Sequence, residues 1–223
     1  MTFDIRNFAV FEVGGTQIWL TETMLVTWAI MAVLVLFAVV VRVKLKKFTE
    51  QPTGFQNVVE TMVETLDGFV RSMAGPKLQF LGNWFFCVFM FVLVSNFSGV
   101  FGIRPPTADW SMTFALALAT FLIIQIVGGK YRGWKYFVGF LNPLNLIGEL
   151  ARPVSLSFRL FGNILAGLIL MAMVYNVAPI WMQFVFPAAL HGYFDLAIGF
   201  LQTYIFCALS LAFIQGASGL EQE

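Results

Sequence analysis

The sequence predicts an all-α integral membrane protein that crosses the bilayer about five times and ends in two long, strongly tilted, antiparallel helices. Of its 223 residues, 59% are hydrophobic and 11% are charged, whereas soluble domains carry roughly 25% charged residues. Uncharged runs cover 23–41, 78–103 and 110–129, and each reaches the roughly 20 residues that a helix needs to span a hydrocarbon core. From Leu160 to Leu220 ionisable side chains are few, so this tract can cross twice more.

We expect a single membrane domain over residues 1–223. Its expected parts are an external N-terminal segment at 1–22, crossings at 23–41, 80–103 and 110–129, an amphipathic helix at 52–73 on the cytoplasmic side, and long helices at 143–175 and 180–216. The first crossing follows Asp4, Glu12 and Glu22, an acidic start that differs from the basic start of a signal peptide. We therefore expect this helix to remain in the mature protein.

The basic residues predict which side of the membrane each loop faces. With five crossings, one set of loops holds Arg42, Lys44, Lys46, Lys47, Arg71, Lys77, Lys130, Arg132 and Lys135. The other set holds Arg6 and Arg104. Because lysine and arginine gather in the cytoplasmic loops of membrane proteins, we expect the first set in the cytoplasm, the N-terminus outside and the C-terminus inside.

Residues 52–73 have the pattern of an amphipathic helix. Apolar side chains recur at three- and four-residue spacing from Phe55 to Met73, which defines one apolar helix face. The opposite face carries Glu60, Glu64 and Asp67, and acidic side chains are poorly suited to anionic lipid headgroups. Two interpretations stay open, a helix that binds a protein partner and a helix that only connects two crossings at the membrane surface.

The two C-terminal helices are predicted to be too long to stand upright in a membrane. The first covers some 33 residues, or about 50 Å at 1.5 Å per residue, and the second is of comparable length, whereas the hydrocarbon core is only about 30 Å thick. They must therefore tilt or bend, and Pro187 with Gly192 offers a place to bend. Residues 176–179 supply a turn between them.

Polar side chains form a stripe along each of these two helices, because positions three and four residues apart lie on one side of a helix. The first stripe consists of Glu149, Arg152, Arg159 and Asn163. The second consists of His191, Asp195, Gln202 and, approximately, Ser210. On antiparallel neighbours the two stripes can face each other.

Arg159 is the strongest functional candidate. An arginine near the bilayer centre costs about 2.5 to 3.5 kcal/mol on insertion scales, so such residues are rarely kept for packing alone. Unlike lysine, arginine does not give up its proton in proteins, and it therefore supplies a permanent positive charge. The alternative is a buried Arg159–Asp195 ion pair that only fixes helix packing.

The charged neighbours of Arg159 each have a functional and a structural interpretation. Glu149 and Arg152 lie near the cytoplasmic end of their helix, where they take part in ion transfer or form an ordinary local ion pair. Asp195 is a candidate for a proton relay or the wall of an aqueous channel. His191 is either a second relay or a hydrogen-bonded helix residue.

Uncharged residues of the two helices also allow two interpretations. Asn163 and Gln202 either hold water or form an interhelical hydrogen bond. The small residues Gly162, Ala166 and Gly167 let another helix approach closely, and this helix belongs either to a partner or to the same chain.

The sequence lacks the features of several other functional classes. No nucleotide-binding loop, nucleophile motif or metal-ligand cluster is present, so we expect no catalytic site, metal or cofactor in this chain. Cys87 and Cys207 lie within apolar runs, where cysteine behaves as a small hydrophobic residue. The net charge of +1 and the dispersed basic residues argue against nucleic-acid binding. The two halves of the chain do not repeat each other, which argues against an inverted-repeat transporter.

One segment closely resembles the signature helix of subunit a of F-type ATP synthases, namely R-P-V-S-L-S-F-R-L-F-G-N-I-L-A-G-L at 152–168. Three further segments are similar to the same family in the same order. They are P-P-T-A-D-W at 105–110, N-P-L-N-L-I-G-E-L at 142–150 and L-Q-T-Y-I-F at 201–206. The resemblance extends from about residue 20 to the C-terminus.

This resemblance implies a stator subunit, in the plasma or inner membrane of a cell, that couples H⁺ or Na⁺ flow to rotation and ATP synthesis. The implied partners are the ring of c subunits, the peripheral-stalk b subunits, the remaining synthase subunits and the lipid bilayer. The resemblance also implies that Arg159 faces the carboxylates of the ring, with Ser155, Gly162 and Ala166 beside it.

The resemblance further implies two offset half-channels lined by polar residues, with Asn163 and Gln202 as neighbours of Arg159. Asp195 stands where relatives commonly carry a histidine or an acid. Some relatives place a glutamate at the position of Leu168, so Asp195 is expected to supply the ionisable group of that half-channel here.

Two other functions are also compatible with the sequence. An autonomous channel or secondary transporter would conduct ions as an isolated chain in liposomes. A non-conducting membrane scaffold would tolerate the loss of Arg159.

Overall fold

The computed structural model describes residues 7–13, 16–45, 54–177 and 190–220. Within these residues, five helical segments are long and apolar enough to cross a membrane. They are Glu22–Leu45, Pro76–Phe101, Trp110–Arg132, Pro143–Asn176 and Gly192–Ser218. The predicted all-α membrane fold with five crossings is confirmed.

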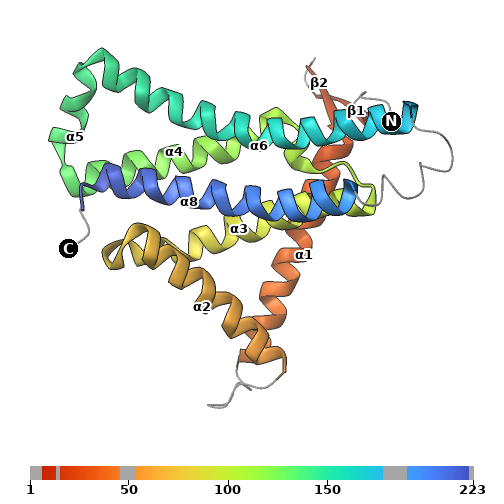
Figure 1. Cartoon of the computed structure of the whole chain (residues 1–223), viewed down its shortest axis with the longest axis horizontal. Coiled ribbons are helices and arrows are strands. Elements are labelled where there is room, and N and C mark those ends of the chain that lie inside the picture. The colour runs from red at the N-terminus through yellow and green to blue at the C-terminus, as the bar shows by residue number, and fades with distance from the viewer. Residues whose placement is uncertain (1–6, 14–15, 46–53, 178–189, 221–223) are drawn as a thin grey trace.

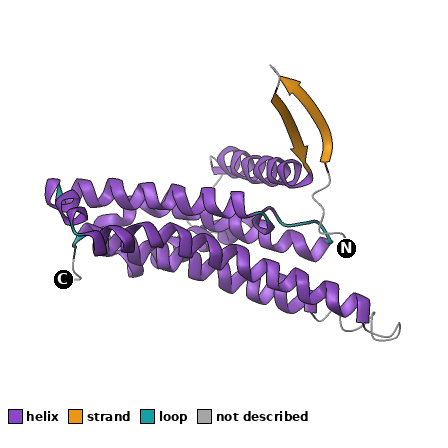
Figure 2. Cartoon of the chain, turned by 90° about the horizontal axis from the view of Figure 1, so that it is seen from above, coloured by secondary structure: helices purple, strands orange, loops and turns teal. Residues whose placement is uncertain are grey.

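A two-stranded antiparallel hairpin precedes the first crossing. Strand β1 (Asn7–Val13) pairs with strand β2 (Thr16–Thr21), and Figure 2 shows the hairpin standing away from the helices. These strands were not predicted from the sequence. Their signal was present, because two runs rich in β-branched and aromatic residues flank Gly14 and Gly15.

Helices α1 (Glu22–Leu45) and α2 (Phe55–Ala74) lie beside the main bundle rather than inside it (Figure 1). Helix α1 has buried residues only in its first part. Helix α2 is amphipathic, and Val70 and Ala74 near its end belong to the hydrophobic core. Glu64 on its polar face is exposed. The apolar face of α2 therefore packs at least partly against this chain.

Four long helices form the bundle. They are α3 (Gly82–Phe97), α4 (Trp110–Arg132), α6 (Pro143–Val177) and α8 (Gly199–Ser218). Helix α4 packs against both α6 and α8, and α3 packs against α8. Side chains from all four helices are fully buried between them, including Phe85, Ile124, Leu160 and Phe206.

Short turns and helices connect the bundle. They are the 3-10 turns η1 (Pro76–Leu81), η2 (Ser98–Phe101), η3 (Pro106–Ala108) and η4 (Gly139–Leu141), and the short helix α5 (Trp134–Val138). The turns η2 and η3 lie at one end of the bundle, and α5 with η4 lies at the other (Figure 1).

Helices α6 and α8 run antiparallel (Figure 1). Helix α6 has 35 residues, about 50 Å at 1.5 Å per residue, so it is too long to stand upright in a membrane. A π-helix, η5 (Gly192–Ile198), leads into α8. Such π-helical turns are rare in proteins, and those that occur are often found at functional sites. The expected bend at Pro187 and most of the expected turn at 176–179 lie outside the described residues.

Candidate functional site

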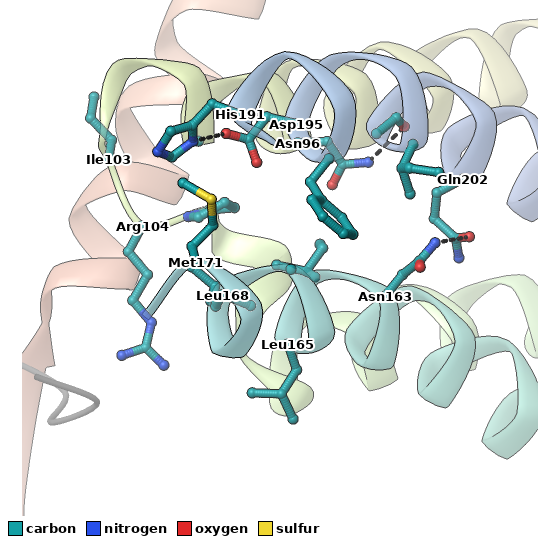
Figure 3. Close-up of a pocket in the computed structure, with 18 of the residues that line it drawn as sticks. Asn96, Ile103, Arg104, Asn163, Leu165, Leu168, Met171, His191, Asp195 and Gln202 are labelled. Atoms are coloured by element: carbon teal, nitrogen blue, oxygen red, sulfur yellow. Dashed lines mark hydrogen bonds and ion pairs between the residues drawn. The ribbon is translucent and has the colours of Figure 1, made fainter. Parts of the chain in front are cut away.

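A polar cavity of about 320 Å³ lies between α6, η5 and the segment that follows α3 (Figure 3). Its polar lining consists of Glu22, Asn96, Arg104, Asn163, His191, Asp195 and Gln202. Leu168 and Met171 are among the apolar residues that complete its wall. At about 30 Å³ per water, a cavity of this size holds roughly ten molecules, and its polar groups can hydrogen-bond to them.

His191 and Asp195 form a pair on one wall of this polar cavity. The distance from His191 Nδ1 to Asp195 Oδ2 is 2.6 Å, and 27% and 21% of the two side chains are exposed. A Cβ atom on Gly99 would lie only 2.9 Å from Asp195 Cγ, so the absence of a side chain at Gly99 leaves room for the carboxylate. Two ionisable groups joined by a hydrogen bond, in a cavity large enough for water, are suited to proton transfer.

Asn163 and Gln202 meet at another point of the same cavity. Asn163 Nδ2 donates a hydrogen bond to Gln202 Oε1 at 3.0 Å, which joins α6 to α8. Gln202 is 4% exposed, and its Nε2 has no hydrogen-bond partner among the described residues. The contact is thus an interhelical hydrogen bond, and it also leaves a buried donor available to water.

Arg159 lies one helical turn from Asn163 and is exposed. Across the described parts of the chain, its guanidinium takes part in no ion pair and no hydrogen bond. The alternative of a packing pair between Arg159 and Asp195 is not realised there, because Asp195 is paired with His191. Arg159 therefore presents an unneutralised charge on the surface of α6.

An open strip runs along α6 on either side of Arg159, and we define it as Ser155, Arg159, Gly162 and Ala166. Ser155 and Ala166 are exposed, and a Cβ atom on Gly162 would meet no atom of another helix within 4 Å among the residues that the structure describes. Gly167 differs, since a Cβ atom there would lie 3.3 Å from the Phe194 ring. Gly167 thus serves packing within this chain, whereas Ser155, Arg159 and Ala166 of the open strip are exposed.

A second polar cluster lies near the start of α6. Glu149 Oε1 and Arg152 Nη1 are 2.6 Å apart, and the Arg152 guanidinium carbon lies 5.2 Å from the Phe213 ring centre on α8. Tyr136 on α5 is close by, and its burial together with the Glu149 charge raises the pKa of its hydroxyl above the usual value. Glu149 and Arg152 therefore form a local ion pair, as one of their two interpretations expected.

The helical spacing grouped residues that lie in different surroundings. Of the first stripe, Glu149 and Arg152 form the second polar cluster, Arg159 is on the open strip, and Asn163 lines the polar cavity. Ser210 of the second stripe is buried, and its hydroxyl donates to Phe206 O at 2.7 Å instead of reaching the cavity.

Three buried polar residues beside the polar cavity were not predicted from the sequence. Asn96 on α3 donates to Gly199 O and to Thr203 Oγ1, at 3.0 and 3.2 Å. Thr107 Oγ1 donates to Asn96 Oδ1 at 2.9 Å. A signal for Asn96 was available, because an amide inside an apolar crossing is costly unless it is hydrogen-bonded.

Arg104 was assigned only to a loop, yet it lines the polar cavity and pairs with Asp109 at 3.3 Å. Within the part of the chain that the structure describes, no three His, Cys, Asp or Glu side chains gather in a way that could hold a metal ion.

Comparison with known proteins places the chain beside one group of membrane proteins. Residues 24–215 match the family described as ATP synthase A chain. The "ATP synthase subunit a, sodium ion specific" of Propionigenium modestum is 34% identical, over 89% of this chain and 74% of the relative. The "ATP synthase subunit a 2" of Syntrophotalea carbinolica is also 34% identical, over 86% and 83% of the two chains. The "ATP synthase subunit a" of Geobacter sulfurreducens is 32% identical, over 86% and 85%.

Proposed function

Because this multi-pass membrane chain belongs to the family of ATP synthase subunit a, we propose that it is the ion-translocating stator subunit of a rotary F-type synthase. The observation that carries this proposal is the setting of Arg159. Its charge is exposed, has no acidic partner among the described residues and lies one turn from Asn163 of the polar cavity. A positive charge in that position is available to a carboxylate on a neighbouring subunit.

The proposed partner of Arg159 is the carboxylate of a c subunit in the rotating ring. In lipid such a carboxyl group is neutral, because desolvation penalises its charged form. Beside the Arg159 guanidinium the anion is favoured, so the carboxyl group releases its ion to an adjacent aqueous path. Further rotation into lipid then requires that an ion from a second path reloads it.

The open strip of α6 is the proposed contact surface for the ring. Small side chains let two helices approach closely in membranes. The residues beside Arg159 on this strip are all small, namely Ser155, Gly162 and Ala166. Arg159 can then reach a ring carboxylate without a bulky neighbour in the way.

The polar cavity is the proposed half-channel on one side of Arg159. Within it, Gln202 and Asn163 lie nearest to Arg159 along the helices, and the His191–Asp195 pair supplies the ionisable group. Both members of this pair come from the segment around η5. They can therefore act as the relay although position 168 is a leucine in this chain.

The second polar cluster marks the proposed half-channel on the other side. Glu149 precedes Arg159 by ten residues, or about 15 Å along α6, and Asn163 follows it by four. Arg159 therefore separates the two polar regions, and its positive charge repels cations that would leak directly between them. Each charge that crosses gains about 2.3 kcal/mol per 100 mV of membrane potential, which is the energy available for rotation.

The basic residues give the proposed orientation of the chain. Lys130, Arg132 and Lys135 lie at the α5 end of the bundle, which the positive-inside rule assigns to the cytoplasm. The polar cavity then opens to the outside, with the N-terminus outside and the C-terminus inside. Peripheral-stalk b subunits, other synthase subunits and lipid are the remaining proposed partners, and ATP chemistry takes place on other subunits.

The test of this proposal is Arg159→Ala in the complete synthase, with ATP-driven ion pumping and ATP synthesis measured in membrane vesicles. We expect both to be lost while the chain still assembles, because the side chain is exposed and its removal breaks no ion pair or hydrogen bond to a described residue. Pumping at the normal rate would refute the proposal and favour a scaffold. Ion conduction by the isolated chain in liposomes would favour an autonomous channel.

A further inference from the structure

We propose that Asn96 is a positioning residue for the His191–Asp195 pair, and that it acts by holding the junction between η5 and α8. This inference rests on the proposed function, because it assigns a role to a residue behind the relay rather than to the relay itself. Asn96 lies on α3 and therefore belongs to neither of the polar stripes on α6 and α8.

Asn96 ties three separate parts of the chain together. It is 3% exposed, and its partners Thr107 and Thr203 are fully buried. Its amide nitrogen donates to Gly199 O at 3.0 Å and to Thr203 Oγ1 at 3.2 Å. Its amide oxygen accepts from Thr107 Oγ1 at 2.9 Å. A buried network in which each member is satisfied fixes one arrangement of the helices that it joins.

The orientation of this amide follows from its partners. The Gly199 carbonyl can only accept a hydrogen bond, so the amide nitrogen of Asn96 must face it and the oxygen must face Thr107. Both N–H groups are then engaged within the protein. Asn96 therefore serves as a connection between helices rather than as a free ligand for a passing ion.

Gly199 is the point at which the winding of the helix changes. It follows the last residue of η5 and begins α8, and its carbonyl also accepts from Thr203 Oγ1 at 2.8 Å. A π-helical turn is less favourable than an α-helical one and needs local support. The hydrogen bond from Asn96 supplies such support from a neighbouring helix, and a Cβ atom on Gly199 would lie only 3.1 Å from Asn96 Cβ.

The same stretch of chain also contacts the carboxylate. Gly99 follows Asn96 by three residues, and a Cβ atom there would lie 2.9 Å from both Cγ and Oδ1 of Asp195. Asn96 thus holds the end of η5 while Gly99 leaves space for the Asp195 side chain within it. Loss of the Asn96 bonds would let η5 shift and would change the position of Asp195 relative to His191.

The charged groups that face the relay come from two other parts of the chain. Glu22 at the start of α1 and Arg104 after η2 line the same polar cavity as His191 and Asp195. Arg104 is also paired with Asp109. A shift of η5 would alter the distances from the relay to Glu22 and Arg104, so the pH dependence of transport reports on its position.

The test is Asn96→Leu in the complete synthase, since leucine has a similar shape but no hydrogen-bonding groups. ATP-driven ion pumping is measured over a range of pH and normalised to the amount of assembled chain. We expect pumping to fall about fivefold to tenfold, the scale for losing one or two buried hydrogen bonds. We also expect the pH of half-maximal pumping to move by roughly half a unit or more.

Ser95→Ala is the matched control. Ser95 is the neighbouring residue on α3 and is equally buried, but its hydroxyl has no hydrogen-bond partner among the described residues. This variant should keep both the rate and the pH profile. If Asn96→Leu fails to assemble, the same two measurements are made on Thr107→Val. This variant removes only the hydroxyl that orients the Asn96 amide, so the positioning role predicts a lower rate and a shifted pH profile for it too.

Unchanged pumping, or a lower rate with an unchanged pH profile, would overturn the positioning role, because a merely structural defect lowers the rate at every pH.

The outcome is separable from the proposed function. Arg159→Ala that pumps normally would remove the stator function itself. Arg159→Ala that abolishes pumping, together with a normal pH profile for Asn96→Leu, would remove only the inference about Asn96.

Discussion

Asn163 Nδ2 and Gln202 Oε1 are joined by a 3.0 Å hydrogen bond that links α6 to α8 beside the polar cavity. The bond lies one helical turn from Arg159. It leaves the buried Nε2 of Gln202 without a partner among the described residues, so this nitrogen can donate to a water molecule. Gln202 is therefore well placed to extend a chain of hydrogen bonds from the polar cavity toward Arg159.

We predict that Gln202→Leu slows ion transport without preventing assembly. Leucine fills a similar volume but removes the acceptor for Asn163 and the donor for water. ATP-driven pumping per assembled complex should fall roughly fivefold to tenfold, as expected when a buried hydrogen bond is lost and its partner is left unsatisfied. Pumping is measured with an ion-gradient probe in membrane vesicles.

The control for this variant is Ser210→Ala on the same helix. Ser210 is equally buried, but its hydroxyl bonds only to the Phe206 carbonyl and does not line the polar cavity. Ser210→Ala should pump at the normal rate. Equal rates for Gln202→Leu and Ser210→Ala would show that the Gln202 amide has no part in transport.

Hydropathy was sufficient to predict most of this fold. Each crossing is a run of apolar residues long enough for the bilayer, and a helix is the only structure that satisfies the backbone of a single such run in lipid. The β1–β2 hairpin lies outside this rule, because it precedes the first apolar run and depends on strand propensity. The change of winding at η5 was not predicted either, and the hydrogen bond that Asn96 donates to Gly199 O at its end comes from another helix.

The candidate site was predictable only in part. Spacing along a helix fixes the direction of a side chain relative to its neighbours, but not which other helix covers it. Arg159 and Asn163 therefore lie on the same predicted helix face, although in the structure Asn163 contacts Gln202 on α8 and Arg159 is exposed. Arg104 was missed as a cavity residue, and Thr107 as a partner of Asn96, because the fold rather than the local sequence brings η2 to η5 and η3 to α6.

We predict that Ala166→Phe impairs the contact with the ring while leaving the fold of this chain intact. Ala166 is exposed on the open strip, so we expect this chain to accommodate a phenylalanine there. A bulky ring would instead hold the c subunits away from Arg159, since close helix contact in membranes depends on small residues. The amount of chain in the membrane should stay normal, and coupled ATP synthesis should fall about tenfold or more, a loss of roughly 1.4 kcal/mol in coupling.

Leu150→Phe is the matched control for this substitution. Leu150 is also exposed on α6, but sixteen residues before Ala166, which places it about 160° around the helix. It should therefore keep normal coupling. If Ala166→Phe and Leu150→Phe synthesise ATP equally well, the open strip is not the surface that faces the ring.

We predict that Arg159→Lys also impairs coupling, although it keeps the positive charge. An arginine binds a carboxylate through two parallel hydrogen bonds from a rigid planar group, whereas a lysine ammonium is a flexible point charge that can lose its proton when it is desolvated. Because no acid among the described residues pairs with Arg159, a lysine at this position would depend entirely on the partner's carboxylate for stabilisation. ATP synthesis driven by an imposed ion gradient should fall at least about tenfold.

Arg152→Lys separates this effect from a general intolerance of lysine on α6. Arg152 has its own acid, Glu149, at 2.6 Å, so an ammonium group at that position retains an ion-pair partner within the chain. Arg152→Lys should therefore keep most of the gradient-driven synthesis. The comparison isolates what the exposed guanidinium requires, because both variants conserve charge and only Arg152 has an acidic partner among the described residues. Synthesis by Arg159→Lys at the level of Arg152→Lys would mean that charge alone suffices and that the planar geometry of Arg159 has no role in coupling.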